Sequence, residues 1–265
     1  MKIYHDSNSF MEHCFHILET SLPSPEPMMI GDGYVLRYRK EHHCLEVAIL
    51  QKLARYISGL KASLLLLESG YTQEIGALFR TLDEFGEDIM FLSLPGIGKG
   101  KWTSTHEKYL DSFFQEEFDN PNNAILSTQK RPTIPRKKIR GAIAEAGMGG
   151  LNQNDAVEVS RTLSQAYSGY VHGASEHILE MVGGNPLRYH LSGMAGTMRQ
   201  DEFASDYWNY SYRGLISVVM AAKVLGSATL VDECYNFLAY FEERTGESGK
   251  GDAEQLMAQA KRKNA

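Results

Sequence analysis

Two long amphipathic runs, separated by a single glycine, constrain this fold more than any other feature of the chain. Apolar residues recur at three- and four-residue steps through residues 41–69 and again through residues 71–94, which is the spacing of one face of an α-helix. Gly70 stands between the two runs, and glycine readily takes the backbone conformations that end a helix. The sequence therefore predicts two long helices that form an antiparallel hairpin.

The rest of the chain carries further helical patterns and almost no strand pattern. Helices are expected over residues 9–20, 104–114, 136–146, 153–182, 203–225 and 229–245. A proline-rich stretch after residue 20 indicates an extended connector, and residues 187–191 a short extended segment. We expect an all-α protein, a single bundle of about six helices with the hairpin at its centre. Its predicted parts are an N-terminal helix and Pro-rich connector (1–40), a helical-bundle domain (41–245) and a charged flexible tail (246–265).

Composition indicates an ordinary globular protein of the cytoplasm. Hydrophobic residues make up 43% of the chain and charged residues 23%. The formal net charge of −6 argues against a surface built throughout to bind nucleic acid, although it allows a local basic patch. The three cysteines are widely spaced and lack a Cys-x-x-Cys pair, which predicts reduced thiols. With no apolar leader and no run of about 18 apolar residues, we expect no membrane partner.

The second run of the hairpin carries charges among its apolar residues, and these are the first candidates for a functional site. Arg80 and Glu84 are four residues apart, so they share a helical face, and this face lies away from Leu82. In one interpretation the pair is a solvated surface contact of little energetic weight. In the other, a further element covers the pair, which then needs an additional hydrogen-bond partner.

A second candidate segment lies far downstream, in Tyr-Ser-Gly-Tyr-Val-His-Gly at residues 167–173. Gly169 and Gly173 are four apart, and residues without a Cβ let another backbone or a ligand approach closely. We therefore take both glycines, together with Tyr170, as candidate ligand-binding residues. His172 is the side chain that we expect to complete the hydrogen bonding of the Arg80–Glu84 pair.

The predicted site therefore consists of Arg80, Glu84 and His172. We expect them to form an interior polar cluster that either fixes the helix packing or lines a pocket for a small molecule or nucleotide. In the alternative hypothesis the protein is a metal-independent ribonuclease of a defence or toxin system, in which His172 is the general acid–base and Arg80 stabilises phosphate charge. Whether the chain is an enzyme is left open, as is homodimer formation.

A basic run between Lys130 and Arg140 holds six cationic side chains and no acid. Such a run can hold the phosphates of a nucleotide or of RNA, which makes Arg136 and Lys137 further ligand-binding candidates. It can equally be a solvated turn that lies near the acidic residues 116–119, and we favour this second interpretation.

Motifs for metals and cofactors are missing from the sequence. No Glu-x-x-His pair of a di-iron bundle occurs, and the histidine pairs lack the company of a zinc motif. The glycines at 96–100 do not have the spacing of a phosphate-binding loop, and no nucleophile elbow is present. We therefore predict no metal and no cofactor.

Two of these segments also carry a resemblance to known proteins. Residues 64–94, with Arg80-Thr-Leu-Asp-Glu84, and residues 167–173 resemble a bacterial family of helical proteins of unknown function. That resemblance implies a joint role for Arg80, Glu84 and His172. A more distant similarity to HEPN-type helical bundles implies the ribonuclease alternative. The Arg-x4–6-His motif of those bundles is missing from the long helix expected over 153–182. Its only spacing match, Arg37–His42, lies at a helix start.

Overall fold

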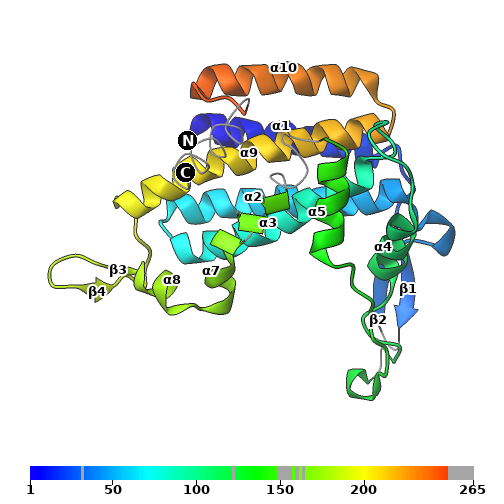
Figure 1. Ribbon diagram of the computed structural model, residues 1–265, viewed down its shortest axis with the longest axis horizontal. Coiled ribbons are helices and arrows are strands. Elements are labelled where there is room, and N and C mark those ends of the chain that lie inside the picture. Colours follow the sequence, from blue (N-terminus) through cyan, green and yellow to red (C-terminus); the bar gives the residue numbers. More distant parts are fainter. Residues whose placement is uncertain (31–32, 121–122, 148–156, 159–160, 163–164, 250–265) are drawn as a thin grey trace, which may run out of the picture.

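The computed structural model describes residues 1–265 with the exception of residues 31–32, 121–122, 148–156, 159–160, 163–164 and 250–265. Over these described residues the chain forms nine α-helices and four short strands, which confirms the predicted all-α class. Most of the predicted tail (246–265) lies outside the described residues. Five long helices lie side by side and make up the bundle (Figure 1), namely α1 (Lys2–Glu19), α2 (Leu45–Glu68), α3 (Thr72–Ser93), α9 (Met198–Val224) and α10 (Ala228–Thr245).

Shorter elements are attached to this bundle. The short helices are α4 (Ser104–Phe114), α5 (Arg136–Glu145), α7 (Ser168–His172) and α8 (Ser175–Leu179), with 3-10 turns at Lys40–His42 and Ala124–Leu126. Two antiparallel hairpins pair β1 (Glu26–Ile30) with β2 (Gly33–Arg37), and β3 (Val182–Gly183) with β4 (Arg188–Tyr189). Across the described part of the chain, no helix is long and apolar enough to cross a membrane.

The two predicted long helices are α2 and α3, and they meet at Gly70, which has a φ of +76°. Lys52 forms an ion pair with Asp88, and nearer the turn a Cβ on Gly59 would touch the side chain of Leu82. A residue later in α2 therefore contacts a residue earlier in α3, so the two helices run antiparallel. The place of this pair at the centre of the bundle stays a prediction.

The core lies where α2, α3 and α9 face one another, with α1 and α10 beside them. The apolar positions that repeat at helical spacing are the ones that become buried. On α1, α2, α3 and α9 they include Met11, Leu18, Leu53, Leu60, Ile75, Phe79, Leu82, Ile89, Tyr207, Leu215 and Val218. The N-terminal helix thus packs into the same core as the hairpin.

Two sequence expectations differ from the structure. The helix expected over 153–182 is wrong in its second half, because Gly173 takes a φ of +63° and ends α7, and α8 then gives way to β3. Most of its first half falls outside the described residues. The connector expected to be merely extended instead runs into the β1–β2 hairpin.

Candidate functional site

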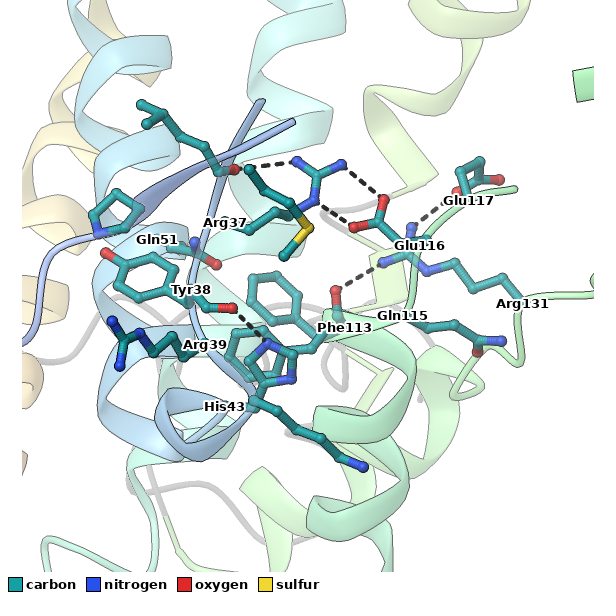
Figure 2. A pocket seen from close by; sticks show the side chains of 15 residues that line it. Arg37, Tyr38, Arg39, His43, Gln51, Phe113, Gln115, Glu116, Glu117 and Arg131 are labelled. Carbon is teal, nitrogen blue, oxygen red and sulfur yellow. Dashed lines mark hydrogen bonds and ion pairs between the residues drawn. The ribbon is translucent and has the colours of Figure 1, made fainter. Parts of the chain in front are cut away.

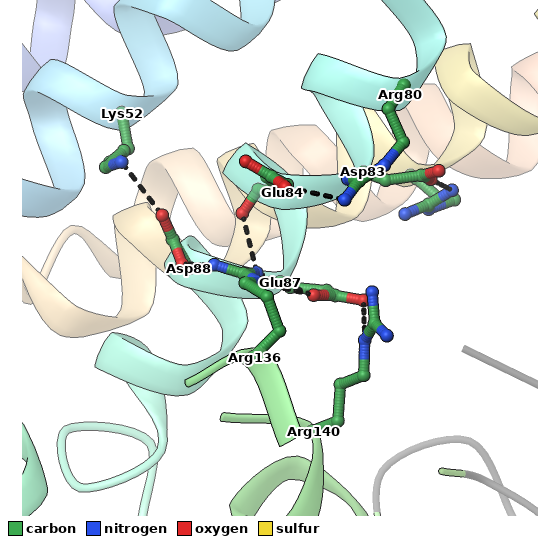
Figure 3. Close-up of polar contacts among 9 residues, drawn as sticks. Lys52, Arg80, Asp83, Glu84, Glu87, Asp88, Arg136 and Arg140 are labelled. Atoms are coloured by element: carbon green, nitrogen blue, oxygen red, sulfur yellow. Dashed lines mark hydrogen bonds and ion pairs between the residues drawn. The ribbon is translucent and has the colours of Figure 1, made fainter. Parts of the chain in front are cut away.

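The charged face of α3 is the most concentrated polar feature of the structure, and Figure 3 shows how other helices meet it. Four carboxylates of α3 receive cationic side chains from α2, α5 and α9 and from α3 itself. We call the nine side chains the α3 charge network: Lys52, Arg80, Asp83, Glu84, Glu87, Asp88, Arg136, Arg140 and Arg213.

The middle of the network joins α5 to α3. Arg136 contacts Glu87 at 2.6 Å and Asp88 at 2.5 Å, and Arg140 contacts the second oxygen of Glu87 at 2.7 Å. The Asp88 side chain is only 5% exposed. Burial by itself disfavours the charged form of Arg136, but the carboxylates of Asp88 and Glu87 outweigh it and raise the pKa of Arg136. These ion pairs are therefore partly desolvated contacts between helices.

Lys52 connects the network to α2 and to a group of aromatic rings. Its ammonium lies 2.8 Å from Asp88 Oδ2 and 5.1 Å, 5.2 Å and 5.9 Å from the ring centres of Phe85, Phe113 and Tyr109. Ring faces attract a cation, so the ammonium has partners on several sides although its side chain is only 16% exposed.

The far end of the network reaches α9. Arg213 Nη1 donates to Asp83 Oδ1 at 2.7 Å, and the hydroxyl of Tyr210 donates to the same oxygen at 3.1 Å. Asp83 Oδ2 and Arg80 Nη1 are both buried without a hydrogen-bond partner among the described residues. Because an unpaired buried polar atom is destabilising, these two atoms mark the least satisfied part of the network.

The structure brings two of the three predicted site residues together. Arg80 and Glu84 form an ion pair at 2.7 Å whose side chains are 22% and 41% exposed, so the pair is only partly covered. Helix α5 lies beside it, since Arg136 donates to the Glu84 backbone carbonyl at 3.2 Å. His172 instead lies exposed at the end of α7, and in the described part of the chain no hydrogen bond or ion pair joins it to Arg80 or Glu84.

The glycines and tyrosine beside His172 have packing roles. A Cβ on Gly169 would lie 2.1 Å from the ring of His177, so the close approach that this glycine permits comes from the next helix. Gly173 provides the left-handed C-cap of α7. Tyr170 packs on Gly76 of α3, where a Cβ would lie 2.5 Å from the ring, and its hydroxyl donates to Glu180 at 2.5 Å.

Tyr167 and Asp206 provide a test of pH dependence. The Tyr167 hydroxyl donates to Asp206 Oδ2 at 2.6 Å, yet burial raises the pKa of Asp206 above the ordinary value of 3.8. Below that value the carboxyl is protonated whether the chain is folded or not. Between that value and the raised pKa, the unfolded chain loses its proton while the folded chain keeps it, so stability falls as the pH rises until it has passed the raised pKa. We expect Asp206→Asn to be more stable than the native chain at pH 7 and equal to it near pH 3, measured by urea unfolding. A less stable variant at pH 7 would contradict this.

The basic run divides into two parts. Arg131 pairs with Glu117 at 3.1 Å, in agreement with the predicted position of the run near residues 116–119. Arg136 and Arg140 instead belong to the α3 charge network. Lys137 is exposed, and no ion-pair partner for it lies among the described residues.

Two adjoining hollows lie beside these charges. The larger, of about 670 Å³, lies between the β1–β2 hairpin and the end of α4 and is shown in Figure 2. The smaller, of about 490 Å³, is bordered by Lys52, Asp88 and Arg136 of the network. Both are lined by Phe113, Glu117 and Arg131.

The larger hollow holds residues that sequence reasoning missed. Arg37, at the end of β2, lines it together with Tyr38, Arg39, Lys40 and His43 from the segment that follows the hairpin. The available signal was Arg37-Tyr38-Arg39-Lys40, in which basic residues flank an aromatic one.

Comparisons with known protein families, with curated proteins and with solved structures find no match to this chain. The resemblances noted in the sequence therefore stay predictions. Among the described residues, no three His, Cys, Asp or Glu side chains are grouped so that they could hold a metal ion.

Proposed function

We propose that this protein acts by binding a small anionic molecule that carries a planar ring, the chemical class to which nucleotides belong. The proposed site is the larger hollow at the base of the β1–β2 hairpin. One observation carries the proposal: the hollow is lined by four cationic side chains and two carboxylates, in a chain whose net charge is −6. The cations are Arg37, Arg39, Lys40 and Arg131. Three of them pair with glutamates, Arg37 with Glu116, Arg39 with Glu26 and Arg131 with Glu117, and Lys40 is the lining cation without an ion-pair partner among the described residues. Cations that line a hollow attract anions.

The carboxylates of the hollow occupy positions that an anionic ligand would take. Arg37 donates two hydrogen bonds to Glu116, one of them at 2.8 Å from Nη2 to Oε2, and the Glu116 side chain is 56% exposed. Phosphate oxygens match the same two-pronged guanidinium geometry. An incoming phosphate can therefore replace an exposed glutamate without movement of the backbone.

Aromatic side chains supply a surface for the planar part of the ligand. The rings of His43 and Phe114 stack with their centres 4.3 Å apart and their planes 6° apart, and Tyr38 and Phe113 line the same hollow. Flat aromatic surfaces beside cations are the arrangement that favours a nucleobase attached to phosphate. We therefore assign the planar ring of the ligand to the side of the hollow that carries His43.

Lys40 gives the most direct test, because it is exposed, lines the hollow and has no ion-pair partner among the described residues. We expect isothermal titration calorimetry with nucleoside mono- and diphosphates to show binding to the native chain. Lys40→Ala should weaken it about tenfold, which corresponds to ~1.4 kcal/mol. Glu116→Gln should strengthen it, since the variant removes the competing carboxylate.

Lys61→Ala is the matched control. Lys61 lies on α2, pairs with Glu12 of α1 and does not line the larger hollow, so its removal should leave the affinity unchanged. The proposal is wrong if no nucleotide binds at millimolar concentration, or if Lys40→Ala and Lys61→Ala weaken binding equally. RNA cleavage by the native chain that is lost in His172→Ala would instead favour the ribonuclease hypothesis.

A further inference from the structure

Two of the three cysteines meet inside the bundle, although 220 positions separate them in the sequence. Cys14 lies on α1 and Cys234 on α10, and their Sγ atoms are 3.9 Å apart. Both side chains are 0% exposed. The third cysteine, Cys44, lies at the start of α2 and is partly exposed.

The contact between the two thiols belongs to an extended interface between α1 and α10. Beside it, the rings of Phe10 and Phe237 stack with centres 4.1 Å apart and planes 4° apart. The rings of Tyr4 and Phe241 lie 6.2 Å apart further along the same two helices. Because aromatic packing sets the spacing of the helices, the two sulfur atoms are held near each other without a bond between them.

We propose that Cys14 and Cys234 are an oxidation-sensitive thiol pair that closes into an intramolecular disulfide and fastens α1 to α10. The sulfur atoms need to approach by about 1.9 Å to reach the bonding distance of a disulfide, which side-chain rotation of two cysteines on facing helices can provide. This assignment is independent of the proposed ligand site, which lies at the β1–β2 hairpin.

Hydrogen peroxide serves as the oxidant, and each step balances. The thiolate of Cys234 attacks one peroxide oxygen, so that an S–O bond forms, the O–O bond breaks, and hydroxide leaves and takes up the proton released by Cys234. The sulfur of Cys14 then attacks the sulfenic sulfur of Cys234, the S–S bond forms, and hydroxide leaves with the proton of Cys14. Two thiols and one peroxide thus yield one disulfide and two waters.

The two thiols are not equivalent, which sets the order of these steps. Either thiol can donate across this contact. Donation by Cys14 to an ionised Cys234 lowers the pKa of Cys234, while the same contact together with burial raises the pKa of Cys14. Cys234 is therefore the more readily ionised of the two and attacks first. Since both are enclosed, we expect the pair to react more slowly with bulky thiol reagents than Cys44 does.

Thiol counting and peptide mapping test the proposal on the full chain. After treatment with hydrogen peroxide, we expect titration of the denatured protein to fall from three thiols to one, and mass spectrometry to find the Cys14 and Cys234 peptides joined. A cross-link that closes so long a loop should raise the unfolding temperature by about 10 °C, and reduction should reverse the rise.

Variants make the assignment specific. Cys44→Ala should still form the disulfide, whereas Cys14→Ala and Cys234→Ala should not. Because Cys14→Ala and Cys234→Ala change the core, their folding is checked by circular dichroism. The peptide map of the native chain shows whether the disulfide forms even if these variants do not fold. Failure to find the joined peptide under conditions that oxidise Cys44 would overturn the proposal, as would a cross-link that persists in Cys14→Ala.

Discussion

Replacement of Asp88 by alanine is expected to lower the free energy of unfolding by about 3–5 kcal/mol, the largest loss that we predict from a single charge. The Asp88 carboxylate is 5% exposed and bonds to both Lys52 and Arg136. Its removal leaves the partly buried Lys52 without an ion-pair partner among the described residues, while Arg136 keeps its pair with Glu87. An uncompensated buried charge is far more destabilising than a lost surface contact. Urea unfolding at pH 7, followed by circular dichroism, measures the change.

Lys61→Ala is the control for this prediction as well. The pair that Lys61 forms with Glu12 has side chains 42% and 46% exposed, and its loss should lower stability by at most about 1 kcal/mol. If Asp88→Ala loses no more than this control, the α3 charge network is a set of ordinary surface contacts and does not hold the helices together.

Gly70→Ala is expected to be the second most disruptive change, with a loss of about 3 kcal/mol. Gly70 has a φ of +76°, a conformation that disfavours a side chain by roughly 1–2 kcal/mol. A Cβ there would also lie 2.2 Å from the backbone nitrogen of Ala195 and 2.7 Å from the carbonyl carbon of Met194, and backbone atoms cannot move aside as a flexible side chain can. The measurement is again urea unfolding.

Gly98→Ala separates the two causes. Gly98 has a φ of +70°, yet a Cβ added there meets nothing within 4 Å among the described residues, so only backbone strain applies. We expect a loss of about 1 kcal/mol for this control. Equal losses at Gly70 and Gly98 would show that the loop at 193–196 yields to the added methyl group.

Helical periodicity was enough to predict the two long helices of the hairpin, but it did not show which element packs against each of their faces. The spacing of Arg80 and Glu84 correctly placed them on one face of α3, away from Leu82. The element that packs beside this face, α5, comes from about 50 residues further along, and no local pattern links Arg136 to Glu87. Long-range ion pairs depend on how helices pack, and this information is not contained in the period of one helix.

The continuous helix expected around His172 was wrong for a different reason. The two glycines suggested a site on a continuous helix, but Gly173 ends α7, and Gly169 makes room for the ring of His177 from the following helix. Two glycines four residues apart look the same in the sequence whether they lie within one helix or at the end of one. The β1–β2 hairpin left a weak signal, since Gly31-Asp32-Gly33 is typical of a turn and Tyr34-Val35-Leu36 follows it, but Glu26 and Pro27 are poor strand formers.

The way in which α5 is attached has a consequence for access to the smaller hollow. Only Ile139 and Ala144 of this helix are buried, so its position depends on the ion pairs of Arg136 and Arg140 more than on apolar area. Elements with little buried apolar surface open locally before the rest of a domain unfolds. Backbone amides of α5 should therefore exchange with solvent faster than those of α2 or α9. The smaller hollow, which Arg136 and Ile139 border, then opens with α5 while the bundle stays folded.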